Sequence, residues 1–200
     1  MTHLTAGWLG GTTPDGSDAD RDPGERLRRA RACASEGRLL RAVFLCLEAR
    51  EEPPVAAEAN ALLARLADGG EVPVLSRLPA GDRGRVLGAA RPRRLPAGEI
   101  LPYPEGGDCL LLIARGELAV VGRAPWGGEV ELGRAREGEV LGLPEPEEEK
   151  RGPRRLVVTR PAELIELERG RVCQGGGAEA WRRLLELARE RMLRCAGVRP

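Results

Sequence analysis

The sequence predicts a mainly β domain flanked by helices, in which eight short antiparallel strands form a closed roll or sandwich. Three observations support this prediction. Eight short apolar or alternating runs recur between residues 91 and 167, and turn residues separate them. Helical periodicity dominates residues 24–67, and residues 178–197 form an amphipathic segment. The expected architecture is a helical hairpin, a β-roll and a C-terminal helix.

The composition is that of an ordinary globular protein. The chain has 200 residues, of which 42% are apolar, which suffices to bury a core in one domain or in one domain with a smaller unit. The formal net charge is +1 with both signs spread along the chain, which predicts no direct nucleic-acid binding and no membrane attachment. No apolar run approaches the roughly 20 residues of a membrane span, and the N-terminus lacks a signal-peptide pattern. We therefore expect a cytoplasmic protein.

The inventory of reactive side chains argues against catalysis. His3 is the only histidine and lies in a predicted tail, which excludes a histidine-based metal site or catalytic triad. No Walker or G-x-S-x-G motif occurs. The five cysteines have no C-x-x-C spacing, and their apolar or helical surroundings predict buried free thiols in a reducing compartment: Cys33, Cys46, Cys109, Cys173 and Cys195. We expect neither an enzyme nor a bound cofactor or metal.

The N-terminal third divides into two parts. Residues 1–23 are rich in Gly, Thr, Asp and Pro and predict a disordered leader. Residues 24–70 predict helices that end at Gly37, at 53–54 and at 69–70. The small residues of this segment resemble those of one tetratricopeptide repeat with a following helix, although the usual aromatic residues are missing: Ala30, Cys33, Ala42, Cys46, Ala49 and Pro54. A plain helical hairpin explains the same pattern, and both interpretations stay open.

Residues 71–196 begin with a short helical stretch and continue as β-rich runs. These runs are RPRRL, EILPY, CLLLIA, GELAVVGR, GEVELGR, GEVLG, RLVVT and AELIEL. Residues 129–132 alternate between acidic and apolar, which is typical of a half-buried strand. The run CLLLIA has no polar face, so we expect it to be buried on both sides.

The last segment carries an apolar stripe on one helix face. Its residues recur at helical spacing, and they predict either packing onto the roll or a surface for self-association: Trp181, Leu184, Leu185, Ala188 and Met192. Packing and association remain alternatives for each of these side chains.

Residues 74–195 resemble the cyclic nucleotide-binding domain family, which is the module of catabolite activator proteins and of the regulatory subunits of cyclic-AMP-dependent kinase. LSRLPAGDRGRVL resembles the first helix of the family, and LPAGEIL resembles its P-A-G-E turn. EGGDCLLLIARGELAVV resembles its E-G-D…L-Y-x-I-x-x-G-x-V-x-V segment, and Gly138 and Gly142 match the glycines of G-x-x-F-G-E. The resemblance implies an antiparallel eight-stranded β-roll of the jelly-roll type, a double-stranded β-helix, over residues 71–196.

The family binds its ligand with a phosphate-binding cassette. A Glu after the second glycine holds the ribose 2′-hydroxyl, and an Arg about ten residues after that glycine pairs with the cyclic phosphate. Here Leu143 follows Gly142, PEPEEEK replaces the short helix, and Arg154 matches the phosphate arginine in a loop about two residues longer. Arg155 and Leu156 stand where the family has small residues. The resemblance therefore implies a degenerate ligand site at Gly142, Leu143, Arg154 and Arg155.

Two functional hypotheses follow. The favoured hypothesis is a non-enzymatic regulatory or protein-interaction module that has lost cyclic nucleotide binding, in which Arg154 pairs with the adjacent acidic run. Its helices would bind a protein partner or mediate self-association. The alternative is a cytoplasmic sensor that binds cyclic AMP or cyclic GMP through Arg154. A DNA-binding domain is not expected after the last predicted helix, because the chain ends at Pro200.

Overall fold

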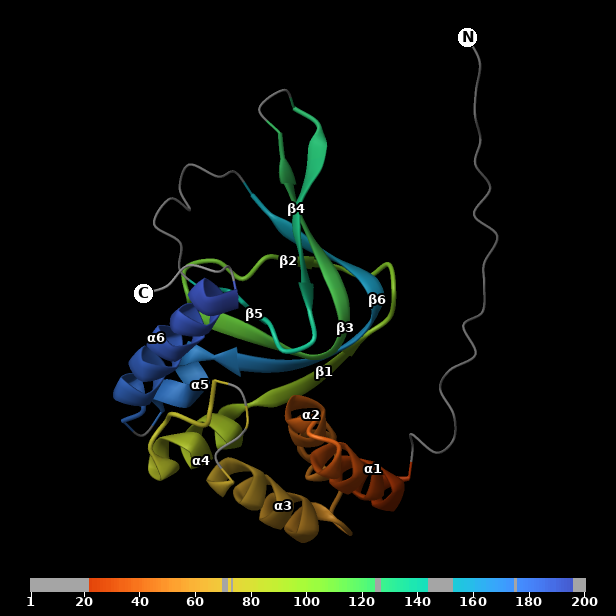
Figure 1. Ribbon diagram of the computed structural model, residues 1–200, viewed down its shortest axis with the longest axis vertical. Helices are drawn as coiled ribbons and strands as arrows, with labels where there is room; N and C mark the ends of the chain where they lie inside the picture. The colour runs from red at the N-terminus through yellow and green to blue at the C-terminus, as the bar shows by residue number, and fades with distance from the viewer. Residues whose placement is uncertain are drawn as a thin grey trace.

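A computed structural model describes residues 22–69, 72, 74–124, 127–143, 153–174 and 176–195, with side chains as far as residue 190. Within these ranges helices lie at both ends of the chain and a single sheet lies between them (Figure 1). Most of the predicted leader, the run PEPEEEK and the side chains of Met192 and Cys195 lie outside the described residues.

Four helices precede the sheet: α1 (Pro23–Ser35), α2 (Leu39–Ala49), α3 (Ala56–Asp68) and α4 (Ala80–Ala89). Asp22 caps α1 by accepting a hydrogen bond from the Gly24 N–H at 3.0 Å. Gly37, with φ at +74°, follows the C-terminal cap of α1, and α2 folds back on α1. The small residues of both helices are buried between them, as a close helical hairpin requires, while the tetratricopeptide interpretation stays a prediction: Ala30, Cys33, Ala42, Cys46 and Ala49.

Six strands form one antiparallel sheet: β1 (Arg91–Leu95), β2 (Ile100–Pro102), β3 (Cys109–Arg123), β4 (Glu129–Arg136), β5 (Val140–Leu141) and β6 (Arg155–Glu168). The main order is β1-β6-β3-β4, while β2 pairs with the other end of β6 and β5 pairs with β3. The long β3–β6 pair thus carries every other strand. The antiparallel sheet with flanking helices confirms the coarse fold prediction.

The described residues contain six strands where the sequence predicted eight, because two pairs of predicted strands are continuous. CLLLIA and GELAVVGR are one strand, β3, and RLVVT and AELIEL are one strand, β6. The turn residues between these runs bend the strands without ending them. Gly116 has φ at +99°, and the β3–β6 register shifts around it. A glycine in a strand therefore marked an irregularity and not a strand end.

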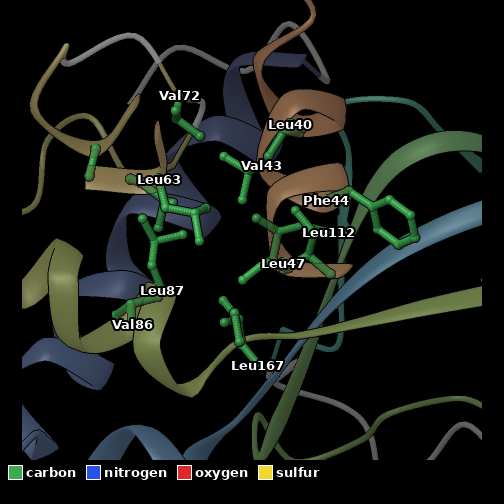
Figure 2. Close-up of a cluster of buried hydrophobic side chains, with 14 of the residues drawn as sticks. Leu40, Val43, Phe44, Leu47, Leu63, Val72, Val86, Leu87, Leu112 and Leu167 are labelled. Atoms are coloured by element: carbon green, nitrogen blue, oxygen red, sulfur yellow. The ribbon is translucent and has the colours of Figure 1, made fainter. Parts of the chain in front are cut away.

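The half of the β3–β6 pair that contains the run CLLLIA is buried on both faces, as the lack of a polar face in that run predicted. Leu110 and Leu112 pack against the helices together with Leu167 of β6. Leu111 and Ile113 point to the opposite side and join a second cluster inside the roll. Figure 2 shows the first cluster, in which side chains of α2, α3 and α4 meet Leu112 and Leu167. The β3–β6 pair thus contributes side chains to two hydrophobic clusters, one on each of its faces.

Charged side chains fasten α2 to the sheet beside this core. Arg41 Nε donates a hydrogen bond to Glu163 Oε2 at 3.1 Å, and both residues are buried. Arg94 of β1 makes a two-point contact with Glu48 of α2, at 2.6 and 2.7 Å, and lies over the ring of Phe44. The N-terminal helices therefore share both a core and an ion-pair network with the sheet.

Two helices follow the sheet, α5 (Arg169–Cys173) and α6 (Ala178–Cys195). Three residues of the predicted stripe, Trp181, Leu184 and Ala188, are buried in the core shared with the first helices, and Leu185 is half-buried against it. Glu179, Arg182 and Glu186 form ion pairs on the exposed side of α6. None of the helices in the described ranges has the length and apolar composition that crossing a membrane requires.

We predict that Gly116→Ala destabilises the fold strongly. A Cβ at this position would lie 2.5 Å from the Pro161 carbonyl oxygen and 2.6 Å from Ala162 Cα, in a conformation with positive φ. We expect a loss of at least about 2 kcal/mol of unfolding free energy, measured by urea denaturation.

Two glycines supply matched controls for this prediction. Gly98 has φ at +87° with open space around it, so Gly98→Ala tests backbone strain alone, and Gly133→Ala has neither problem. The order of loss should be Gly116, then Gly98, then Gly133. Equal losses at Gly116 and Gly98 would show that the contact with β6 is not tight.

Candidate ligand site

Gly142 is fixed by close backbone packing. It directly follows β5 and has φ at +92°. A Cβ here would collide with the carbonyl oxygen of Cys109 and would approach Pro104 Cγ to 3.0 Å. Only glycine fits, because both the backbone angle and the space exclude a side chain. The glycine that the sequence comparison singled out is therefore explained by packing.

Leu143 belongs to the core. Its side chain is 3% exposed and lies in the cluster that the helices share with the sheet. In the family that the sequence resembles, the residue after this glycine holds the ribose. Leu143 has no polar atom in its side chain, and its burial turns it away from solvent. It contributes to stability by burying apolar surface.

Arg154 lies inside the roll and interacts with residues of the loop between β2 and β3. Its guanidinium carbon is 4.1 Å from the centroid of the Tyr103 ring, and its Nε is 3.6 Å from Glu105 Oε1. Only 3% of its side chain is exposed. The Tyr103 N–H also donates to the Arg154 carbonyl at 3.2 Å, which aligns the two residues across the strands. The chain's own aromatic ring and carboxylate thus occupy positions around this cation.

Arg155 lies on the opposite face of β6, as alternation along a strand requires. It forms an ion pair with Glu129 of β4, and its side chain is partly exposed. It is paired in register with Val121 of β3 and with Pro102 of β2. The two adjacent arginines therefore have separate environments, one inside the roll and one outside it.

A depression of about 370 Å³ lies at the end of the sheet where these segments meet. Its lining includes Arg154 and Arg155 but neither Gly142 nor Leu143, so the structure brings together only half of the predicted site. Three arginines and one glutamate line it, which favours an anion over a cation: Arg123, Arg154, Arg155 and Glu129. No group of three metal-ligating side chains occurs in the described part of the chain.

Sequence reasoning missed the residues that contact the two arginines. Tyr103 and Glu105 lie about fifty positions from Arg154, and Glu129 lies 26 positions from Arg155. The acidic run was expected to pair with Arg154. That run lies outside the described residues, and the carboxylate beside Arg154 is that of Glu105. These contacts follow only from the pairing register of the strands, which the sequence alone does not give.

The apolar stripe of α6 does not form part of this depression. Trp181, Leu184 and Ala188 are buried in the helix–sheet core. A role for this stripe in association stays a prediction, and the side chain of Met192 lies outside the described residues.

Comparison with protein-family models finds no match, and no curated protein has a significantly similar sequence. Solved structures give similarities in fold alone. The regulatory domain of Toxoplasma gondii protein kinase A with cAMP has a TM-score of 0.48 at 17% identity, over 72% of this chain and 52% of that chain. A mutant regulatory subunit of a cAMP-independent protein kinase A from Trypanosoma brucei, with cAMP in its A site, has a TM-score of 0.46 at 21% identity, over 64% and 44%.

The Thermus thermophilus catabolite activator protein has a TM-score of 0.44 at 22% identity, over 62% of this chain and 60% of that protein. The present chain thus spans about half the length of the two kinase regulatory chains. The cAMP in those two structures is a property of those proteins.

We predict that the thiol of Cys109 stays protonated well above neutral pH. The backbone carbonyl of the same residue lies against Gly142. Burial, and next the charge of Glu166, raise its pKa from 9.0 to about 12. Because the folded-state pKa is the higher one, the stability contributed by this thiol is fully present below pH 9 and is lost as the pH rises toward about 12.

Urea denaturation between pH 8 and about pH 11 measures this effect. Cys109→Ala should flatten the decline of the unfolding free energy above pH 9. Glu166→Gln removes the charge but not the burial and should give an intermediate slope. A slope unchanged in Cys109→Ala would contradict the assignment.

Proposed function

We propose that the chain is a non-enzymatic regulatory or protein-interaction module with a roll similar to that of cyclic nucleotide-binding domains, and that it does not bind cyclic nucleotides. The observation that carries the proposal is the environment of Arg154. Its guanidinium is buried against Tyr103 and lies 3.6 Å from Glu105 Oε1. A cyclic phosphate at this arginine would be placed beside the Glu105 carboxylate, which repels it.

The ribose side of the proposed site supports the same conclusion. Leu143 offers no acceptor for a sugar hydroxyl, and its side chain is part of the core. Each lost polar partner costs about 1–3 kcal/mol. Two such losses, together about 2–6 kcal/mol, weaken a micromolar dissociation constant by between about 30-fold and more than about 10,000-fold. The proposed role is therefore contact with a protein partner or with a second copy of the chain, without a cofactor.

A second candidate function is a cyclic nucleotide sensor that uses Arg154 for the phosphate. The specific observation in its favour is the arginine-rich lining of the depression, to which Arg123, Arg154 and Arg155 contribute. An anion could enter there if the Glu105 carboxylate moved away from Arg154. The two functions predict opposite results in a ligand titration.

We predict that isothermal titration with cyclic AMP or cyclic GMP shows no saturable binding below about 1 mM. The reason is the loss of the ribose acceptor together with the competing Glu105 carboxylate. Glu105→Gln removes that negative charge and serves as a sensitised variant. It should strengthen any residual affinity without creating micromolar binding, because Leu143 is unchanged.

The outcome that overturns the proposal is a micromolar isotherm in the unaltered protein that Arg154→Met abolishes. Met keeps an apolar stem on Tyr103, so this variant is preferred to Ala, and circular dichroism checks that it folds. Arg93→Met is the matched control, because Arg93 of β1 does not line the depression. Loss of binding in both variants would indicate a nonspecific electrostatic effect.

A further inference from the structure

The upper half of the sheet has an outer face on which none of the helices in the described residues packs. In Figure 1 the helices gather around the lower half of the sheet, away from the β3–β4 hairpin. Four strands lie side by side in this upper half, in the order β2, β6, β3, β4. Residues paired across antiparallel strands share a face. The row Leu101, Leu156 and Val120 packs into the core of the roll, so the neighbouring rows face outward.

Two outward rows form the centre of this face. One contains Ile100, Val157, Ala119 and Arg134, and the other contains Pro102, Arg155, Val121 and Glu131. Ile100 is 54% exposed, and among the described residues only Leu132 is a comparably exposed large apolar residue. The apolar residues of this face thus lie on β2, β6 and β3, with Arg155 among them, and further charged residues lie at its β4 side.

The charges of this face are arranged with opposite signs about its midline. The outward residues of β3 are acidic, apolar, apolar and basic in order: Glu117, Ala119, Val121 and Arg123. Those of β4 are acidic, acidic, basic and basic in order: Glu129, Glu131, Arg134 and Arg136. The midpoints of the two series are Val120 and Gly133, which are paired with each other. Rotation by 180° about a line through this pair replaces each of these charges of β3 and β4 by its opposite, whereas Arg155 of β6 is brought onto Val157.

We propose that this outer face binds a second copy of the chain about a two-fold axis that runs across the strands at the Val120–Gly133 pair. Arg134 of one copy then faces Glu131 of the other, and Arg136 faces Glu129. Ile100 of one copy packs on Pro102 of the other. A two-fold interface is self-complementary by definition, which matches the antisymmetric charge pattern.

Ion pairs within each chain leave these charges able to contact a partner. Arg134 contacts Glu131 and Glu117 at 2.7 and 3.1 Å, and Arg136 contacts Glu117 at 2.8 Å. The side chains of Arg136 and Glu129 nevertheless stay 68% and 64% exposed. The depression beside Val121 and Arg123 gives the partner's Arg136 a recess next to Glu129. Charges from two copies can therefore join one network.

The size of the face predicts a weak dimer. Four strands about 4.8 Å apart, with seven residues at about 3.3 Å each, give a footprint of about 400 Å² per copy. This is smaller than the roughly 800 Å² per partner of a stable interface. Dimerisation should therefore need micromolar or higher concentration, and it should weaken as salt rises.

Sedimentation velocity from about 5 to about 500 µM, at low salt, tests the proposal. The unaltered chain should pass from monomer to dimer in this range. Glu131→Arg and Arg134→Glu should each weaken homodimerisation at least tenfold, because each places like charges opposite one another. An equimolar mixture of these two variants should form a heterodimer with about the affinity of the unaltered chain, because the opposite charges face each other again.

The mixture distinguishes contacts between copies from contacts within a chain. Each variant still lacks its own internal Arg134–Glu131 ion pair in the mixture, so restored dimerisation must come from contacts between the two chains. Ile100→Ser should also weaken the dimer, whereas Leu132→Ser should not. Leu132 is equally exposed, but its side chain approaches the Cβ position of Gly122, on the other face of the sheet. A monomer at every concentration overturns the proposal, as does a mixture that fails to associate. The proposal rests on the interaction role proposed above, but the nucleotide titration tests that role separately.

Discussion

The pairing of β3 with β6 is the constraint on which the rest of the structure depends. The two strands stay in contact from the Cys109–Glu168 pair to the Val121–Arg155 pair. They bend together where Gly116 lies against the backbone of 161–162, because only a residue without a side chain fits there. Below the bend the pair supports the helices, and above it the pair carries the depression and the outer face. A change at the bend would displace all of these features.

Strand parity then decides what each residue near the predicted cassette can do. Arg154 and Arg155 are adjacent in sequence, yet one is buried beside Tyr103 and the other pairs with Glu129 outside the roll. Leu143 is drawn into the core because the chain leaves β5 through a glycine turn toward the helices. A ligand site needs its polar groups to converge on one space. Here packing distributes the corresponding positions over a core, an interior and an outer surface.

The sequence was sufficient for features that depend on local patterns. Helical periodicity located α1 to α3, and the absence of a polar face in CLLLIA indicated burial on both sides. Turn residues were misleading at Gly116 and Pro161, since a bent strand and a strand end use the same residue types. The contacts of Arg154 were not predictable, because Tyr103 reaches it only through a register set by the whole β2–β6 pairing. Long-range register has no local signal in a single sequence.

The two faces of the upper sheet show how the roll and its surface are related. The inner face is filled by the chain's own side chains, and its only buried arginine is Arg154, beside Tyr103 and Glu105, among the described residues. The outer face keeps Ile100 exposed at its β2 side, and the outward charges of β4 change from acidic to basic along the strand. Burial of a charged group is costly unless it is paired, and inside the roll Arg154 is accompanied by Glu105 and by the Tyr103 ring. The exposed Ile100 and the ion-paired but solvent-exposed charges of β4 lie on the other side of the same sheet, so its interior and its outer surface offer different chemistry to a binding partner.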